Sequence, residues 1–338
     1  MIQVKQLDGI DWASDLFAFS YGVFHLPQWV EAISDKMHPP FYLNFYRDGK
    51  VVGKLSGMEV DGPGRSGHQL YSFSGLIMQE KSVELQRSCL DALKDFAQRK
   101  NYSRVFLYAF DDHLMQKVDV KSFRMSELNE YVIGYENGDA TDLQLGSNLK
   151  RNAKKAQKSG VVVHRTRKPE MLDRMLELID HTKSVRVEKY GKDYNPMYIH
   201  NLNRNGLLHL LENGLGVMFY TEHEGQVDTI LFALEHSPKL YFLLMGSNDR
   251  AYCLGMPSFL AMHISNYAKV NGFNYYNLGV IPLENEGGEG VRKFKEAQGA
   301  RVKSGYNYHT GFLKLPYKLI NPLLDFRMRK YRVYGDAD

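Results

Sequence analysis

The sequence predicts a mixed α/β protein of two tandem domains, and three observations carry this prediction: its length, its composition and an internal duplication. A chain of 338 residues is long enough for two domains that each bury a core of their own. Its residues are 43% hydrophobic and 24% charged, as in soluble globular proteins. We therefore expect an ordered chain with one domain in each half.

The duplication is visible when residues 41–58 are laid over residues 217–234 without gaps. In both segments alternating apolar residues lead to a charged turn that ends in a glycine, Gly49 or Gly225, and a second alternating run follows. This pattern predicts a β-hairpin in each half of the chain.

The same order of elements follows each hairpin. Residues 71–75 and 241–246 are predicted as buried strands that reach a glycine, and residues 88–100 and 258–270 carry apolar positions at helical spacing. Another strand follows each helix, in RVFLYAF and in FNYYNLG. Each half is thus expected to form a mixed sheet with a helix-mediated crossover between parallel strands.

A basic segment separates the two halves, and it predicts a linker helix over residues 148–159. Five cations share one face of this helix: Lys150, Arg151, Lys154, Lys155 and Lys158. Leu149, Ala153 and Ala156 mark the opposite, apolar side. Like charges at this spacing repel one another by a few tenths of a kcal/mol per pair, a cost that a polyanion would offset. Phosphates of a transfer RNA, a nucleotide-linked sugar or coenzyme A would serve, and a solvated basic face is the alternative.

The remaining composition narrows the class of protein. Only Cys89 and Cys253 are present, as suits a reducing compartment, and the acidic N-terminus lacks the pattern of an export signal, so we expect a cytoplasmic protein. Its net charge of +4 is too mild to indicate a polyanionic partner by itself, and no DNA partner is expected. The 12 histidines show no zinc-site spacing, so no metal is expected.

The most unusual stretch is residues 275–300, where a strand ending in Asn277, Leu278 and Gly279 precedes an acidic glycine-rich loop and a basic helix. Loops of this kind usually cover a site, and ligands favour the carboxyl ends of strands in such sheets. We expect the helix to hold Lys295 above the end of the strand.

These segments together resemble the FemAB family: N-L-K-R-N-A-K-K-A on the basic helix, N-L-G on the strand, and F-K with Q-G-A after the glycine-rich loop. The family includes enzymes that add amino acids from aminoacyl-tRNA to peptidoglycan precursors, and a wider group of GNAT-like acyltransferases. The resemblance covers both halves and is strongest over residues 145–308.

The resemblance implies two tandem GNAT-like domains, residues 1–145 and 146–311, with no room for the coiled-coil arm of some family members. It also implies that residues 312–338 return to pack on the first domain. Their mixture of apolar and basic residues is typical of a docked surface helix and, less often, of one that contacts a membrane.

The resemblance further assigns site residues. The pair Phe294 and Lys295 matches a pair implicated in the transfer step, although Phe294 suits the core equally well. Arg186 and Tyr190 match a pair that contacts the nucleotide-sugar peptide. The remaining candidate substrate-binding residues are Lys150, Arg151, Lys154, Asn277, Gly279, Arg250 and Gly255. The last two lie where GNAT proteins offer amides to a pyrophosphate, with a tight helix entry as the alternative.

The implied function is transfer of an aminoacyl or acyl group to an amine of a cell-wall precursor or related glycan. The donor is a co-substrate, aminoacyl-tRNA or acyl-CoA, and no bound cofactor is expected; Lys295 would stabilise an oxyanion or a donor phosphate. Candidate partners are a small-molecule or nucleotide-sugar acceptor, transfer RNA and a membrane surface. Two alternatives stay open: an acyl-CoA-dependent N-acyltransferase acting on an amino sugar or small amine, and a non-catalytic RNA- or glycan-binding protein.

Overall fold

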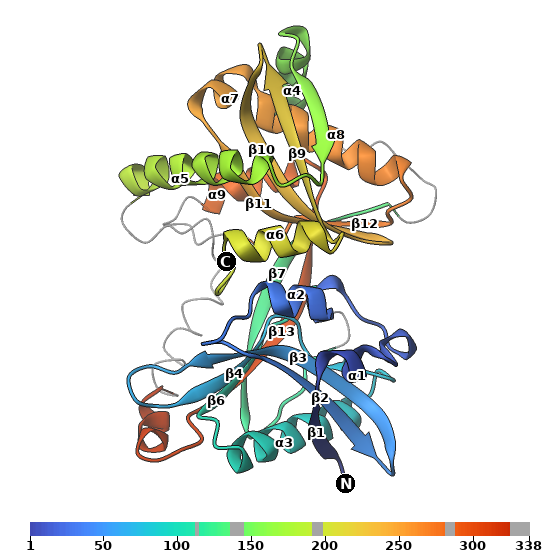
Figure 1. Ribbon diagram of the computed structural model, residues 1–338, viewed down its shortest axis with the longest axis vertical. Helices are drawn as coiled ribbons and strands as arrows, with labels where there is room; N and C mark the ends of the chain where they lie inside the picture. Colours follow the sequence, from blue (N-terminus) through green and yellow to red (C-terminus); the bar gives the residue numbers. More distant parts are fainter. Residues whose placement is uncertain (112–114, 136–144, 191–198, 281–287, 325–338) are drawn as a thin grey trace. The chain divides into compact units, whose positions relative to one another are not determined.

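The computed structural model of the protein describes residues 1–111, 115–135, 145–190, 199–280 and 288–324, with only the backbone of residue 190 (Figure 1). The chain divides into two compact units. Unit 1 comprises Met1–Leu128 and Gly305–Asp338, and unit 2 comprises Asn129–Ser304. Both units are mixed α/β structures, which confirms the predicted fold class.

Unit 1 is built on strands that follow one another in the order β1-β2-β3-β4-β6-β13. Their bounds are β1 Gln3–Leu7, β2 Pro40–Arg47, β3 Lys50–Asp61, β4 His68–Ser72, β6 Arg104–Leu107 and β13 Arg301–Thr310, and the short β5, Ile77–Met78, pairs with β3. Neighbours are antiparallel except β4 and β6, which are parallel and are joined by helix α3, Val83–Arg99.

Helix α3 closes the core of unit 1. Ser82 caps its start by accepting a hydrogen bond from the backbone of Leu85, and the buried residues Cys89, Leu93 and Phe96 pack into the main hydrophobic cluster of the unit. Short helices α1 Gly9–Ala13, η1 Leu16–Ala18, η2 Val23–His25 and α2 Pro27–Ala32 precede β2, and α1 and α2 contact β2 and β3, respectively.

Unit 2 repeats this architecture with strands in the order β7-β12-β11-β10-β9-β8. Their bounds are β7 Phe123–Gly134, β8 Val162–Thr166, β9 Gly216–His223, β10 Gln226–His236, β11 Lys239–Ser247 and β12 Tyr275–Asn277. Neighbours are antiparallel except β11 and β12, which are parallel. Two helices, α7 Asp249–Leu254 and α8 Met256–Val270, form the crossover between them.

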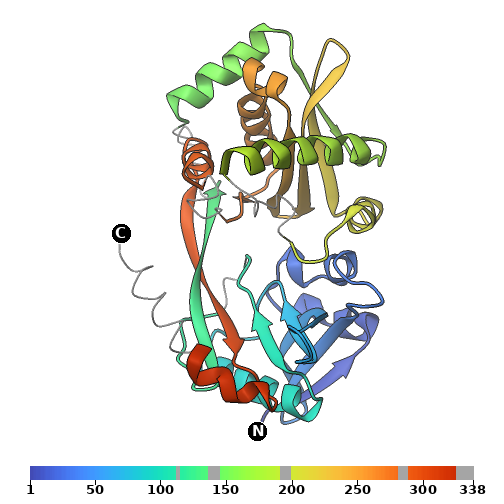
Figure 2. The same ribbon diagram turned by 90° about the vertical axis from the view of Figure 1, so that its left-hand side faces the viewer.

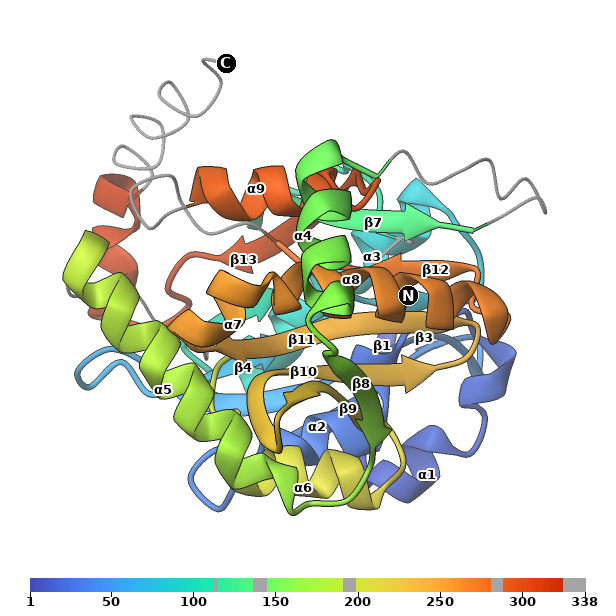
Figure 3. The same ribbon diagram turned by 90° about the horizontal axis from the view of Figure 1, so that it is seen from above.

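Among the described residues, four further helices belong to unit 2: α4 Ser147–Lys158, α5 Met171–Tyr190, α6 Arg204–Glu212 and α9 Gly288–Glu296. Figure 2 shows α5 running across the strands of this unit, where it contacts β10 and β11. Figure 3 shows α4 lying over α8. Among the described elements α5, with 20 residues, is the longest helix, and none forms a coiled-coil arm.

The duplicated hairpins are confirmed down to their turns. The β2–β3 turn places Asp48 and Gly49 at φ angles of 51° and 79°, and the β9–β10 turn places Glu224 and Gly225 at 53° and 73°. Two successive residues with positive φ are the signature of a tight hairpin turn that matches the twist of its strands. The two turns occupy equivalent places in the sequence repeat.

The unit boundaries differ from the predicted domain limits of 145/146 and 311/312. They fall after Leu128 and after Ser304, inside β7 and β13, so each of these strands contributes to both units. No change of composition marks a point within a strand. For this reason the predicted domain limits fall in the polar stretches that follow the two strands. Residues 305–324 belong to unit 1, where the backbone N–H of Leu313 donates to the carbonyl of Ser103 (2.8 Å).

The basic helix α4 is likewise not a linker between the units. It lies within unit 2 and packs on α7 and α8 through Leu149, Ala153 and Ala156, which are buried as its apolar stripe predicts. None of the described helices combines the length and the apolar composition that a bilayer span requires.

Candidate active site at the carboxyl end of strand β12

Strand β12 ends in a polar turn. The side-chain oxygen of Asn277 accepts a hydrogen bond from the backbone N–H of Gly279 (2.6 Å), and its amide nitrogen donates to Glu130 Oε1 (2.9 Å). Gly279 has a φ of 70°, a conformation that favours glycine. Asn277 and Glu130 are both buried, so the strand end is fixed by a buried polar network.

The neighbouring strand β7 supports this turn through its backbone. The N–H of Tyr131 donates to the carbonyl of Gly279 (3.1 Å), and its carbonyl accepts from the N–H of Leu278 (2.7 Å). The Tyr131 hydroxyl donates to Glu296 Oε1 on α9 (3.3 Å). Residues from β7, β12 and α9 therefore converge on one strand end.

Lys295 extends from α9 to this strand end. Its side chain donates to the carbonyl oxygens of Gly279 (3.0 Å) and Val280 (2.5 Å), and the residue is only 6% exposed. An ordinary solvated helix lysine would point into water. The structure instead places Lys295 in contact with Gly279, at the strand end above which the sequence analysis expected it.

Burial changes the acid–base behaviour of Lys295. Desolvation lowers the pKa of its ammonium group to about 7, and the nearby Glu130 carboxylate opposes this shift. Near neutral pH the group therefore exists in both its charged and its neutral form. A group that titrates at the working pH can donate or accept a proton, and its charged form can stabilise a developing negative charge.

The two residues before Lys295 have different environments. Phe294 is half-buried, and its carbonyl accepts a hydrogen bond from the buried side chain of Gln298 (3.2 Å). Lys293 is exposed and forms an ion pair with Glu289 (2.6 Å) one turn earlier on α9. The structure thus separates a buried lysine from an exposed one on the same helix.

The pairing between β11 and β12 is short. It joins three residues on each strand and ends where Tyr241 faces Asn277, whereas β11 continues to Ser247. On α5, the Thr182 hydroxyl donates to the carbonyl of Ser247 (3.1 Å) and accepts from its N–H (3.2 Å). The described pairing of the two parallel strands thus ends beside Gly279 and Lys295.

The candidate pair Arg186 and Tyr190 lies on the same helix as Thr182. Arg186 is half-buried one turn after Thr182, so it shares the helix face that contacts the end of β11. Tyr190 is the last residue of α5, and its side chain lies outside the described part of the structure. The predicted substrate contacts of both residues stay predictions.

Arg250 takes part in an ion-pair cluster on the β9–β10 hairpin. Its guanidinium donates to Asp228 Oδ2 (3.1 Å), Glu224 Oε2 (2.8 Å) and Gln226 Oε1 (2.5 Å), and it contacts His223 Nδ1 (2.7 Å). Such a set of acceptors accounts for its charge within the fold. The geometry favours a structural role for Arg250 over the predicted donor contact.

Gly255 is the joint between α7 and α8. Its φ is 77°, and a Cβ atom at this position would lie 2.4 Å from the backbone oxygen of Asn152 on α4. Only glycine allows this close approach. Pro257 in the first turn of α8 also lacks an N–H that could bind a phosphate. The structure favours the tight helix entry, the alternative raised for this position, over an amide cradle.

The cationic face of α4 is fully described. All five of its cations are exposed: Lys150, Arg151, Lys154, Lys155 and Lys158. The helix starts close to the end of α9, because the N–H of Gly146 donates to the carbonyl of Ala297 (2.8 Å). The described hydrogen bonds of Lys295 nevertheless go to the strand end and not to α4.

Of the predicted residues, the structure therefore brings Lys295, Asn277 and Gly279 together, and it places the α4 cations, Arg250 and Gly255 elsewhere in unit 2. Glu130 and Tyr131 were missed. Alternation along β7 could not have identified Glu130, because Glu130 and its neighbour Tyr131 are both buried although they point to opposite faces of the strand. No three His, Cys, Asp or Glu side chains among the described residues lie close enough together to hold a metal ion.

The part of the sequence that contains this site matches a known family of domains. Residues 145–296 match the family model described as an acetyltransferase (GNAT) domain, and this segment contains α4, the β9–β12 strands and Lys295. This segment, somewhat less than half of the chain, is similar to a GNAT acetyltransferase domain, and the match supports an acyltransferase. GNAT domains usually use acyl-CoA as a co-substrate. No curated protein gives a significant match to the sequence.

Solved structures with the same fold cover nearly the whole chain. A crystal structure of FemX aligns with a TM-score of 0.69 at 14% identity, over 90% of this chain and 96% of that one. L-PGS from Bacillus licheniformis aligns with a TM-score of 0.57 at 14% identity, over 94% and 96%. A tandem GNAT protein from the clavulanic acid biosynthesis pathway gives 0.52 at 8%, over 93% and 99%. The predicted FemAB-like, tandem GNAT architecture is confirmed.

Proposed function

We propose that the protein transfers an aminoacyl or acyl group to an amine of a cell-wall precursor or a related glycan. The observation that carries the proposal is the buried Lys295 at the carboxyl end of β12, hydrogen-bonded to Gly279 and titrating near neutral pH. The sequence resemblance to FemAB enzymes and the likeness to FemX over most of both chains support the choice of acceptor.

In the proposed reaction a neutral amine attacks the carbonyl carbon of an ester or thioester donor. A C–N bond forms, the bond to the leaving oxygen or sulfur breaks, and the proton of the amine leaves with the alcohol or thiol. The ammonium form of Lys295 stabilises the oxyanion, whose charge develops only in the transition state, or it binds a phosphate of the donor. An activated donor needs little more than placement, so a strong base is not required.

We favour aminoacyl-tRNA as the donor. The five exposed cations on α4 form a surface for the phosphates of a nucleic acid, and this helix begins beside the end of α9. The start of α8, where a GNAT pyrophosphate is expected, packs against Asn152 at Gly255 and includes Pro257. These features reduce the amides available to coenzyme A.

The second candidate is an acyl-CoA-dependent N-acyltransferase that acts on an amino sugar or small amine. The match of residues 145–296 to a GNAT acetyltransferase domain favours it, since acyl-CoA is the usual co-substrate of that fold. The two candidates differ in the donor and in the acceptor, and the proposed chemistry at Lys295 is the same in both.

The test is to incubate the purified protein with separate pools of aminoacyl-tRNA and acyl-CoA, each with nucleotide-linked cell-wall precursors or amino sugars, and to search for acylated products by mass spectrometry. We expect an aminoacylated cell-wall precursor from the first pool. Acylated amino sugar from the acyl-CoA pool alone would support the second candidate. Binding of RNA or glycan without any product, unchanged in Lys295→Met, would overturn both and support a non-catalytic binding protein.

A further inference from the structure

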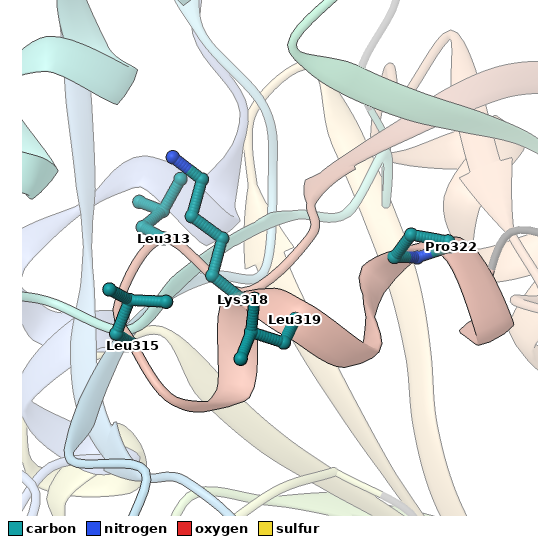
Figure 4. Close-up of a pocket in the computed structure, with 5 residues that line it drawn as sticks. All are labelled: Leu313, Leu315, Lys318, Leu319 and Pro322. Carbon is teal, nitrogen blue, oxygen red and sulfur yellow. The ribbon is translucent and has the colours of Figure 1, made fainter.

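The C-terminal part of unit 1 exposes a group of large apolar side chains. Leu315 is 71% exposed, Leu319 73% and Leu323 55%. A hollow of about 610 Å³ lies among Leu313, Leu315, Lys318, Leu319 and Pro322 (Figure 4). We call the exposed apolar residues of this segment the C-terminal apolar patch: Leu315, Leu319, Ile320, Pro322 and Leu323.

The fold holds the segment that carries this patch in place. Asn321 binds the backbone of Phe312 twice, accepting from its N–H (2.7 Å) and donating to its carbonyl (2.8 Å). The Tyr317 hydroxyl accepts a hydrogen bond from the N–H of Arg65 (3.2 Å), and its ring packs on Phe312. The turn η4, Tyr317–Ile320, therefore presents its apolar side chains outward from anchored backbone.

Cations surround the patch. Lys318 lines the hollow, and Lys314 lies beside Gly67 on the loop that also carries the exposed Arg65. Arg124 donates to the backbone carbonyl of Asn321 (3.3 Å). Apolar side chains interleaved with basic ones are the composition that suits a bilayer interface, where aliphatic groups enter the acyl boundary and lysines reach the phosphates.

We propose that the C-terminal apolar patch docks the protein on an anionic membrane surface. The exposed leucines would enter below the headgroups, and Lys314, Lys318 and Arg65 would bind lipid phosphates. The cations around the patch argue against a second copy of the chain as its occupant, because a two-fold contact would bring the same positive side chains of both copies together. This inference does not depend on the proposed function, since it concerns a surface of unit 1 and no residue of the β12 site.

The experiment is cosedimentation of the full chain with vesicles of phosphatidylcholine alone or with added phosphatidylglycerol. We expect binding to the anionic vesicles that weakens with salt, and a loss on the order of tenfold in the double variant Leu315→Ser and Leu319→Ser. Phe17→Ser is the matched control, because Phe17 is an exposed apolar residue of unit 1 outside the patch. It should bind as the wild type does.

Two results would overturn the proposal. Absence of binding to anionic vesicles by the wild type is one, and equal binding by the wild type and the double leucine variant is the other. A concentration-dependent dimer that the same double variant abolishes, with no vesicle binding, would assign the patch to a second copy of the chain instead. Thermal unfolding of each variant shows that the exposed substitutions leave the fold intact.

Discussion

The parallel strand pairs of the two units share one architecture but end differently. In unit 1 aromatic rings follow β6: Tyr108 lies 5.1 Å from Tyr71, and Phe110 stacks on Phe73 at 4.1 Å, measured between ring centroids. In unit 2 the corresponding position after β12 carries a buried polar turn that binds Lys295. One strand end is thus closed by packing, whereas the other carries a lysine that titrates near neutral pH, and for this reason we assign the proposed chemistry to unit 2.

Each unit also contains a buried lysine, Lys54 in unit 1 and Lys295 in unit 2. Lys54 has the surroundings of a structural residue, whereas Lys295 lies at the candidate site. Lys54 in unit 1 donates to the carbonyl of Trp12 (2.7 Å) and to Asn44 Oδ1 (2.9 Å), and it forms an ion pair with Asp15 (2.5 Å). Burial lowers its pKa, and Asp15 opposes this. Its three donors thus have three partners that hold α1 and η1 on the sheet, as expected of a structural lysine.

The comparison is tested most strongly by removing Lys295. We expect Lys295→Met to reduce kcat/KM by about 10²–10³-fold, as when one donor to a developing oxyanion is lost. Lys293→Met is the control, because it removes an exposed lysine from the same helix. The measurement is steady-state kinetics on both variants. Equal kcat/KM values for Lys295→Met and Lys293→Met would show that Lys295 does not take part in the reaction.

The next largest effect is expected from a substitution at Gly255, between the crossover helices of unit 2, and it concerns the free energy of unfolding. Unit 1 crosses with one helix, α3, whereas unit 2 uses α7 and α8, which meet at Gly255. Gly255→Ala should lower the free energy of unfolding by about 2–4 kcal/mol, because positive φ strain and a clash with Asn152 add. Gly160→Ala, with a φ of 78° and open surroundings, should cost about 1 kcal/mol. Similar urea midpoints for both would contradict the close helix contact.

The substitution Lys54→Met tests whether Lys54, unlike Lys295, contributes to stability and not to activity. We expect a loss of about 1–3 kcal/mol in the free energy of unfolding, since buried acceptors lose their donor, while the half-exposed Asp15 regains water. Activity per folded molecule should stay at the wild-type level. A fall in kcat/KM comparable with that of Lys295→Met would mean that both units take part in the chemistry.

The α4 surface should have the smallest effect. The triple substitution Lys150→Gln, Lys154→Gln and Lys158→Gln should weaken binding of an RNA-bearing donor by about tenfold at low salt and reduce the salt dependence of KM. All three residues are exposed, so stability should hardly change. An unchanged KM for aminoacyl-tRNA would show that this face is only solvated.

Local patterns predicted the parts of the fold that depend on local rules. A glycine at the end of each charged turn, Gly49 or Gly225, predicts the positive φ of a tight hairpin turn. Helical spacing predicts that Leu149, Ala153 and Ala156 lie on one side of α4. The division of β7 and β13 between units could not be predicted, because it depends on pairing between segments far apart in the chain.

The candidate site could likewise be predicted only in part, because some of its contacts follow from a local sequence motif and others join distant parts of the chain. The FemAB-like motif selected Lys295, Asn277 and Gly279, which the structure brings together. The burial of Lys295 and its neighbour Glu130 depend on tertiary packing, which no residue pattern near either of them encodes. The ion pairs of Arg250 are hidden likewise, since their acceptors lie on a hairpin more than twenty residues earlier.

The pH dependence of kcat/KM tests most directly whether the ammonium of Lys295 acts in acyl transfer. With a pKa of about 7, the charged form falls to roughly a tenth of the free enzyme at pH 8. The wild type should therefore lose activity as pH rises above about 7, whereas Lys295→Met should lack this limb and keep only the rise from deprotonation of the acceptor amine. A wild-type profile that follows that of Lys295→Met at every pH would contradict the account.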